Sequence, residues 1–124
     1  MSNTVHIDRM PFKKADTAYI GDTWVDVLEI WEGKNLLDMT AADLSGATFT
    51  AKLQYPNGNE IETFSEGDGI TVASNVVTIT IPASITAAFV DKCCYSLDLQ
   101  AVFASPAMTK TYVRYSITAT NDIT

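Results

Sequence analysis

The stretch Ala47-Thr48-Phe49-Thr50-Ala51-Lys52-Leu53-Gln54-Tyr55 has an apolar side chain at every odd position and a polar one at every even position. This period of two predicts a β-strand with one buried face, because a slip of one residue would turn every apolar side chain outward. The strand runs into Pro56-Asn57-Gly58-Asn59, where Asn-Gly favours the positive φ angles of a tight hairpin turn. Ile61 to Phe64 is then expected as the returning strand. This hairpin is the strongest local signal in the chain and indicates a β fold.

Segments of similar pattern lie on both sides of this hairpin. They are Trp24–Trp31, Gly69–Val72, Val76–Ile81, Tyr95–Phe103 and Thr111–Thr118. In the first of them the alternation breaks between Val27 and Leu28, which predicts a bulge at that point. Pro82 to Phe89 is the one segment with helical spacing, and it predicts a single short helical turn near Ser84–Phe89.

Seven strand-like segments separated by regular turn signals predict an all-β fold. The expected architecture is an immunoglobulin-like antiparallel β-sandwich of about seven strands with one short helical turn. The strands vary in length and one connection carries the helical turn, which favours two sheets over a closed barrel. The residues expected in the core share the inward positions of the alternating segments: Phe49, Leu53, Ile79, Leu97 and Leu99.

Composition narrows the classes of partner. The chain has 124 residues, a size typical of one domain, and 47% of them are hydrophobic, which argues against disorder. Its 8 Lys and Arg residues are outnumbered by 15 Asp and Glu residues, and the net charge is −7. Little positive charge is available to bind phosphates, so no nucleic-acid partner is expected. No apolar run approaches the roughly 18 residues of a transmembrane segment, so no membrane partner is expected.

The cysteines and the N-terminal segment bear on the compartment. Cys93 and Cys94 are adjacent, and neighbours in a strand point to opposite faces, so both are expected to be free thiols with one of them buried. Free thiols suit a reducing cytoplasm. Met1 to Ile20 carries several charges and no apolar core, so no secretory signal peptide is expected.

Few residues carry chemistry. His6 is the single histidine and is expected as a solvated residue near the N-terminus rather than as part of a nucleophilic site. Glu60 and Glu62 are expected on one face of the returning strand, with Glu66 and Asp68 following, but their spacing is not that of a calcium loop. We therefore predict no catalytic residue, no cofactor and no metal site, and expect that the chain is not an enzyme.

The aromatic residues leave an alternative open. They are Trp24, Trp31, Tyr55, Tyr95, Tyr112 and Tyr115. They could form a platform on which sugars stack, but most of them alternate as core residues do, so a core or interface position is favoured.

A set of short motifs recurs in a recognisable order. The motifs are Gly21-Asp22-Thr23-Trp24-Val25, Asp43 to Leu53, Pro56 to Asn59, Val77 to Phe89, Tyr95-Ser96-Leu97-Asp98-Leu99-Gln100 and Ile117 to Thr124. Their order and spacing resemble the immunoglobulin-like domain of small tailed-phage structural proteins, notably the N-terminal domain of upper baseplate proteins. The resemblance covers about Tyr19 to Thr124. Cys94 stands where that family has a glycine, and Ala104-Ser105-Pro106-Ala107 where it has an Asp-Gly turn.

The resemblance implies a non-enzymatic structural component of a bacteriophage virion, in the tail, baseplate, neck or capsid surface. Such a protein acts through assembly with other virion proteins and with copies of itself, and is located in the virion after assembly in the host cytoplasm. The alternative is a carbohydrate-binding or host-surface adhesion module that uses the aromatic residues.

The N-terminal segment is expected to be separate from the domain. Residues 1–18 are predicted to form an arm, and residues 19–124 the sandwich domain. Apolar side chains are spaced along the arm without an expected strand partner, which suggests docking on a neighbour. The candidate assembly contacts are Val5, Ile7, Met10 and Phe12.

Overall fold

A computed structural model describes residues 2–6, 12–32, 40–42, 44, 46–104 and 107–121 of the chain. Strands make up almost all of its regular structure. In chain order the elements are β1 (Ser2–His6), β2 (Phe12–Tyr19), β3 (Trp24–Glu32), β4 (Thr40–Ala41), β5 (Ala47–Gln54), β6 (Glu60–Glu66), β7 (Gly69–Ala73), β8 (Val76–Ile81), α1 (Ala83–Thr86), β9 (Cys94–Ala104) and β10 (Ala107–Thr120). The all-β class and the short helical turn are confirmed.

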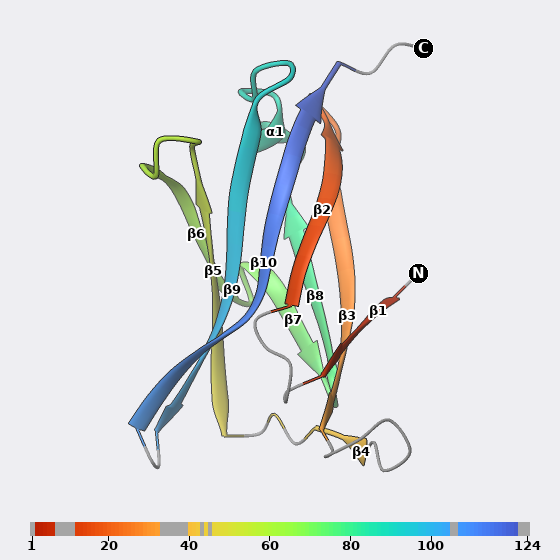
Figure 1. Cartoon of the computed structure of the whole chain (residues 1–124), viewed down its shortest axis with the longest axis vertical. Coiled ribbons are helices and arrows are strands. Elements are labelled where there is room, and N and C mark those ends of the chain that lie inside the picture. Colours follow the sequence, from red (N-terminus) through yellow and green to blue (C-terminus); the bar gives the residue numbers. More distant parts are fainter. Residues whose placement is uncertain are drawn as a thin grey trace.

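All of these strands belong to one mixed sheet. Nine follow the order β1-β3-β8-β7-β6-β5-β9-β10-β2, and β4 lies beside β3. Among the described residues the strands thus number ten rather than about seven. Three neighbouring pairs are parallel, β1 with β3, β2 with β10 and β6 with β7, and the others are antiparallel. The sheet curls, so that β3, β7 and β8 face β5, β9 and β10 (Figure 1).

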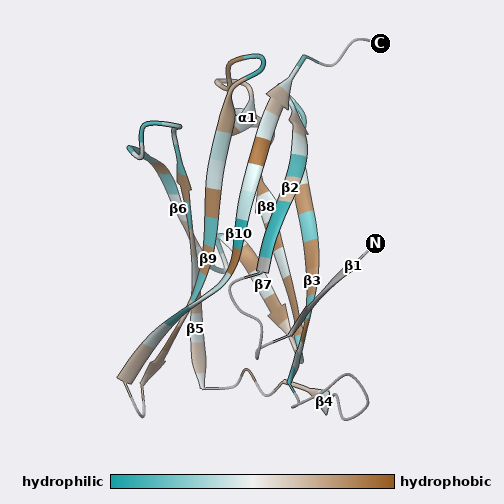
Figure 2. Ribbon diagram, viewed as in Figure 1, coloured by the Kyte–Doolittle hydropathy of each residue, from teal (hydrophilic) through white to brown (hydrophobic). Residues whose placement is uncertain are grey.

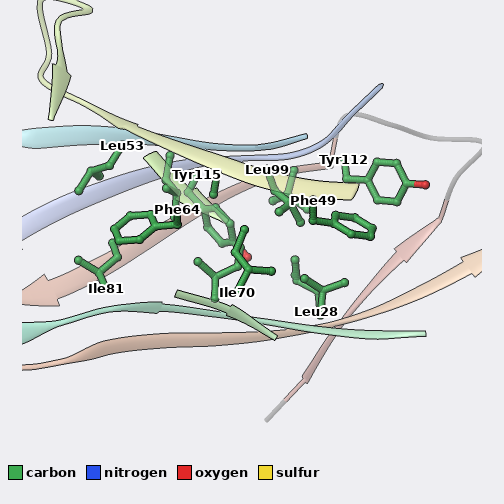
Figure 3. Packing of buried hydrophobic residues seen from close by; sticks show 14 of the residues in the cluster. Leu28, Phe49, Leu53, Phe64, Ile70, Ile81, Leu99, Tyr112 and Tyr115 are labelled. Carbon is green, nitrogen blue, oxygen red and sulfur yellow. The ribbon is translucent and has the colours of Figure 1, made fainter. Parts of the chain in front are cut away.

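The core lies between the facing parts of the curled sheet. Apolar and polar residues alternate along the strands (Figure 2), and the apolar side chains from the two sides point toward one another (Figure 3). The predicted core residues are confirmed, since Phe49, Leu53, Ile79, Leu97 and Leu99 are all fully buried. The sequence pattern therefore identified the buried face of β5, β8 and β9 correctly.

The β5–β6 hairpin forms as its turn residues predict. Gly58 has a φ of 91°, and its N–H donates to the Tyr55 carbonyl. The register contains a shift between Leu53 and Gln54, which pair with Glu62 and Glu60 respectively. Adjacent residues of β5 point to opposite faces, so these two glutamates do not share a face, and the prediction that they do is wrong. The irregularity in β6 is the physical reason, because an extra residue reverses the alternation.

The predicted bulge in β3 is also wrong. β3 pairs with β8 in one unbroken register from Trp24 to Glu29. The inward positions are Trp24, Asp26, Leu28 and Ile30, so the strand alternates regularly with an aspartate in the buried row. The break in the apolar alternation between Val27 and Leu28 predicts a bulge only if Asp26 faces solvent, but the Asp26 carboxylate is paired inside the fold.

The N-terminal residues also differ from the prediction. β2 pairs with Val113–Thr120 of β10, and β1 pairs with Val27–Trp31 of β3. Strands of the sheet therefore lie on both sides of the proposed boundary at residue 18, and an arm without strand partners is not what the structure shows. Both pairings are parallel and connect distant parts of the chain, so no hairpin turn in the sequence predicts them.

Gly69, the first residue of β7, is held in a conformation that other residues rarely adopt. Its φ is 96°, and a Cβ built there would lie 2.6 Å from Cδ1 of Phe64. We expect Gly69→Ala to lower the free energy of unfolding by about 2–3 kcal/mol, the sum of backbone strain and displacement of the Phe64 ring. Gly58→Ala is the matched control, since Gly58 has a similar φ of 91° but open space around it. Equal losses for the two variants in urea denaturation would contradict the clash with Phe64.

Candidate functional site

Two features stand out beyond the apolar core: a polar cluster that links β2 to β3, and the strand edges on the two sides of the curled sheet. The cluster is built by inward-facing side chains of β2, β3 and β10. The edges arise because β1 and β2 end the sheet order and because β6 and β7 pair over only two residues each, Ser65–Glu66 and Gly69–Ile70.

The polar cluster is centred on Asp26, which is 6% exposed. Lys14 Nζ lies 3.1 Å from one carboxylate oxygen of Asp26, and the Tyr115 hydroxyl donates to the other oxygen at 2.6 Å. A buried carboxylate needs such partners, because an uncompensated charge away from water is costly. The cluster thus fixes β2 and β10 against β3 with charge-assisted hydrogen bonds.

A second contact extends the cluster along β2. The Trp24 indole N–H donates to Asp16 Oδ2 at 3.2 Å, and the Trp24 ring meets the Tyr115 ring edge to face, with centroids 5.2 Å apart. Asp16 also accepts from the backbone N–H of Thr17 at 2.8 Å. Side chains from β2 therefore make two separate polar connections to β3, which joins the end of the sheet to the opposite side.

The chemistry of this cluster is that of a structural network. Burial raises the pKa of Tyr115 well above its usual value, and the hydrogen bond to Asp26 and the nearby charges of Asp26 and Asp16 raise it further. Burial, and then the charge of Glu32, raise the pKa of Tyr112. Both hydroxyls therefore stay protonated at neutral pH, and Tyr115 acts as a hydrogen-bond donor rather than as a nucleophile or base.

These raised pKa values predict a loss of stability in alkali. Above about pH 10 tyrosines of the unfolded chain release protons that folded Tyr115 keeps, so the folded state binds more protons and the free energy of unfolding falls as pH rises. The expected slope is about 1.4 kcal/mol per pH unit for each such tyrosine. Urea denaturation between about pH 9 and pH 11 measures it. Tyr115→Phe is expected to flatten the slope, and an unchanged slope in that variant would contradict the assignment.

Another tyrosine fixes the start of β9. The Val90 backbone N–H donates to the Tyr95 hydroxyl at 2.8 Å, and the Tyr95 ring stacks on Phe89 with centroids 4.2 Å apart. On the same connection, the Thr86 hydroxyl donates to the Asp22 carbonyl at 2.7 Å. The helical turn α1 and the loop after it are thereby held against the ends of β3 and β9.

A hollow of about 520 Å³ opens beside β6. β7 begins at Gly69, which pairs with Ser65, so the residues of β6 up to Phe64 have no neighbour in β7. Its walls include the carboxylates of Glu62 and Asp68 and the apolar side chains of Phe64, Ile70 and Ile85. Glu66 is used differently, because its carboxylate accepts from the Phe49 backbone N–H at 2.8 Å. Glu62 and Asp68 therefore line the hollow, whereas Glu66 bonds to the backbone of β5.

Of the four predicted assembly contacts, two lie among the residues that the structure describes. Val5 lies in β1, where its backbone is paired with Ile30, and Phe12 begins β2, where it is paired with Val113. Ile7 and Met10 lie outside the described residues. His6 also lies in β1, paired with Trp31. Sequence reasoning missed Lys14, Asp16 and Asp26. The contact of Lys14 with Asp26 and that of Asp16 with Trp24 both depend on the parallel pairing of β2 with β10.

Most of the aromatic residues lie in the core, and both cysteines are free. Trp24, Tyr95, Tyr112 and Tyr115 are buried, Trp31 is half-buried and Tyr55 is 46% exposed. Trp24 is therefore a core residue and not part of a sugar platform. Cys93 and Cys94 are free thiols, as predicted, but Cys93 is half-buried rather than buried and Cys94 is exposed.

Comparison with known protein families and with curated proteins finds no match to this chain. Within the described ranges, no helix has the length and apolar character that a membrane crossing requires. The same residues contain no group of His, Cys, Asp or Glu side chains placed to hold a metal ion. The geometry therefore defines an all-β protein whose distinctive features are a buried polar cluster and unpaired strand edges.

Proposed function

We propose that the chain is a non-enzymatic structural component of a bacteriophage virion, located in the tail, baseplate, neck or capsid surface and assembled in the host cytoplasm. It acts through contacts with other virion proteins and with copies of itself. The observation that carries this proposal is the strand order. Five of the six motifs on which the resemblance to phage structural domains rests include strand residues: Trp24–Val25 in β3, Ala47–Leu53 in β5, Val77–Ile81 in β8, Tyr95–Gln100 in β9 and Ile117–Thr120 in β10.

We further propose that the curled sheet is an immunoglobulin-like sandwich. One layer is β1-β3-β8-β7, with β4 beside β3, and the other is β6-β5-β9-β10-β2. They are joined in the sheet order only through the short β6–β7 pairing. The contact from Val90 N–H to the Tyr95 hydroxyl supports this assignment. In immunoglobulin-like domains a tyrosine at the start of the corresponding strand bonds back to the backbone a few residues upstream.

The test is quantitative mass spectrometry of purified phage particles produced from the genome that encodes this chain. We expect peptides of the chain at a fixed ratio to the other structural proteins of the particle. Finding the chain in the lysate and not in the particles would overturn the proposal. Quenching of tryptophan fluorescence by sugars is the companion measurement. Saturable quenching without incorporation into particles would favour a carbohydrate-binding or adhesion module instead.

A further inference from the structure

The hollow beside β6 lies where another strand would fit into the sheet. β6 and β7 run parallel, and their pairing begins only at Ser65 and Gly69, while β8 pairs along the other side of β7. The line of β7, continued back past Gly69, therefore runs between the residues of β6 up to Phe64 and the segment after β8. Phe64, together with Pro82 and Ile85 of that segment, lines the hollow, and β6 and α1 lie at the same end of the molecule (Figure 1). The hollow thus occupies the position of an additional strand beside β6.

The backbone of β6 presents hydrogen-bonding groups to this position. The Ser65 N–H donates to the Asp68 carbonyl at 3.1 Å, and the Asp68 N–H donates to the Ser65 carbonyl at 2.9 Å, so Ser65 faces away from β5. Alternate residues of an antiparallel strand present their N–H and C=O groups to the same side, so Thr63 faces away from β5 as well. The Thr63 N–H donates to the carboxylate of the adjacent Glu62 at 3.2 Å. This carboxylate stands where a neighbouring strand would supply the acceptor for Thr63.

The side chains around the hollow combine buried apolar groups with two carboxylates. Phe64 and Ile70 are buried residues that line it. Glu62 pairs with the buried Leu53 and so lies on the inner face of β6, and both Glu62 and Asp68 also line the hollow. Within the described residues neither carboxylate forms an ion pair. A lysine or arginine suits this combination, because its aliphatic stem packs on apolar side chains while its charged end meets a carboxylate.

We propose that the hollow binds an extended segment of another virion protein, which adds as a strand to β6 and places a lysine or arginine beside Glu62 and Asp68. In this mode of recognition the main-chain hydrogen bonds supply affinity and the side-chain pockets supply specificity. The edges of β1 and β2 are also open, and what distinguishes β6 is the hollow with its two carboxylates. The inference rests on the proposed structural function and states the chemistry of one partner.

Binding of synthetic peptides to the isotope-labelled full chain tests the contact directly. The probes are heptapeptides with threonine at alternate positions and every combination of lysine, arginine, glutamate, valine and phenylalanine at the other three. We expect peptides with a basic and an apolar residue to bind roughly tenfold more tightly than their glutamate counterparts. In nuclear magnetic resonance they are expected to shift the Thr63 amide signal and to slow its hydrogen exchange. Equal binding of basic and acidic peptides, no binding by any peptide, or shifts confined to β1 or β2 would overturn the proposal.

Substitutions of the two carboxylates locate the charge contact. Glu62→Gln and Asp68→Asn keep the size of each side chain and remove its charge, and each is expected to weaken binding of the basic peptides several-fold. Glu60→Gln is the matched control, since Glu60 is an exposed carboxylate of the same strand and is not among the residues that line the hollow. The affinity of this control is expected to stay within about twofold of the original, because salt screens exposed charges. Equal losses for Glu60→Gln and Glu62→Gln would overturn the assignment of the charge contact to the hollow.

Incorporation into particles separates this inference from the proposed function. Glu62→Lys reverses a charge inside the hollow, and we expect this variant to be incorporated several-fold less than the control Glu60→Lys. Equal incorporation of the two variants would refute docking in the hollow and leave the structural function standing. Binding of basic peptides at Thr63 by a chain that is absent from particles would establish the site and refute the virion assignment.

Discussion

Asp26→Ala is expected to lower the free energy of unfolding by about 3–4 kcal/mol. Removing one partner of a buried ion pair leaves the other charge uncompensated, at a cost of about 3–5 kcal/mol. The lower part of that range applies because the Lys14 side chain is still 23% exposed and keeps some solvation. The Tyr115 hydroxyl also loses the carboxylate that it meets at 2.6 Å. Urea denaturation at neutral pH measures the loss.

Three companion variants make the Asp26 result interpretable. Asp26→Asn retains an oxygen for the Tyr115 hydroxyl and is expected to cost less than Asp26→Ala. Asp22→Ala removes an exposed carboxylate from the loop before β3 and is expected to change stability by less than about 0.5 kcal/mol. Lys14→Met combined with Asp26→Ala completes a double-mutant cycle, and we expect the two losses to be non-additive. A loss below about 1 kcal/mol for Asp26→Ala would mean that the carboxylate is solvated rather than held in the cluster.

The same residue shows where the sequence pattern fails to predict the fold. Alternation assigns strands correctly wherever the inward row is apolar, as in β5, β8 and β9, and the turn at Asn57-Gly58 is predicted from its own residues. In β3 the inward row contains Asp26, so a rule that places charge outside predicts a bulge that is not there. Its partners, Lys14 and Tyr115, lie 12 and 89 residues away in the sequence. No local pattern reports such partners.

A second failure has the opposite form. β10 does contain an irregularity, between Thr111 and Val113. It lets the consecutive residues Tyr112 and Val113 both be buried, where strict alternation would expose one of them. The sequence gives no signal for it, because Tyr-Val is compatible with either face. The alternation rule thus predicts a false bulge in β3, where the polar Asp26 is buried. It misses the true irregularity in β10, where the neighbours Tyr112 and Val113 are both buried.

The candidate site was less predictable than the core. Strand edges depend on which strands lack neighbours, and that is a property of the complete sheet order rather than of any segment. The sequence predicts that the segment 1–18 lies outside the domain, because Lys13, Lys14 and Asp16 interrupt its apolar residues. Parallel pairing with β10 nevertheless places Lys14 and Asp16 on the inner side of the sheet. There Lys14 donates to Asp26, and Asp16 accepts from the Trp24 indole. Only the three-dimensional arrangement shows that Lys14 and Asp16 bond to side chains of β3 and do not interrupt the strand.

The packing of Phe49 gives the other large expected effect. Phe49 is fully buried in β5, and its ring meets the Tyr112 ring edge to face, with centroids 5.5 Å apart. Its backbone N–H is held by the Glu66 carboxylate, so the main chain has little freedom to close a cavity left by the side chain. Removing the ring therefore leaves both an unfilled space and an exposed face of Tyr112.

Phe49→Ala is accordingly expected to lower the free energy of unfolding by about 3–5 kcal/mol, the range for truncating a fully buried phenylalanine. Thr48→Ala is the adjacent control on the exposed face of the same strand, and a change within about 0.5 kcal/mol is expected for it. Tyr112→Ala in the Phe49→Ala background is expected to cost less than Tyr112→Ala alone, because the two rings share one contact. Strictly additive losses in urea denaturation would contradict the coupling between the two rings, and a loss below about 1 kcal/mol for Phe49→Ala would contradict the register assigned to β5.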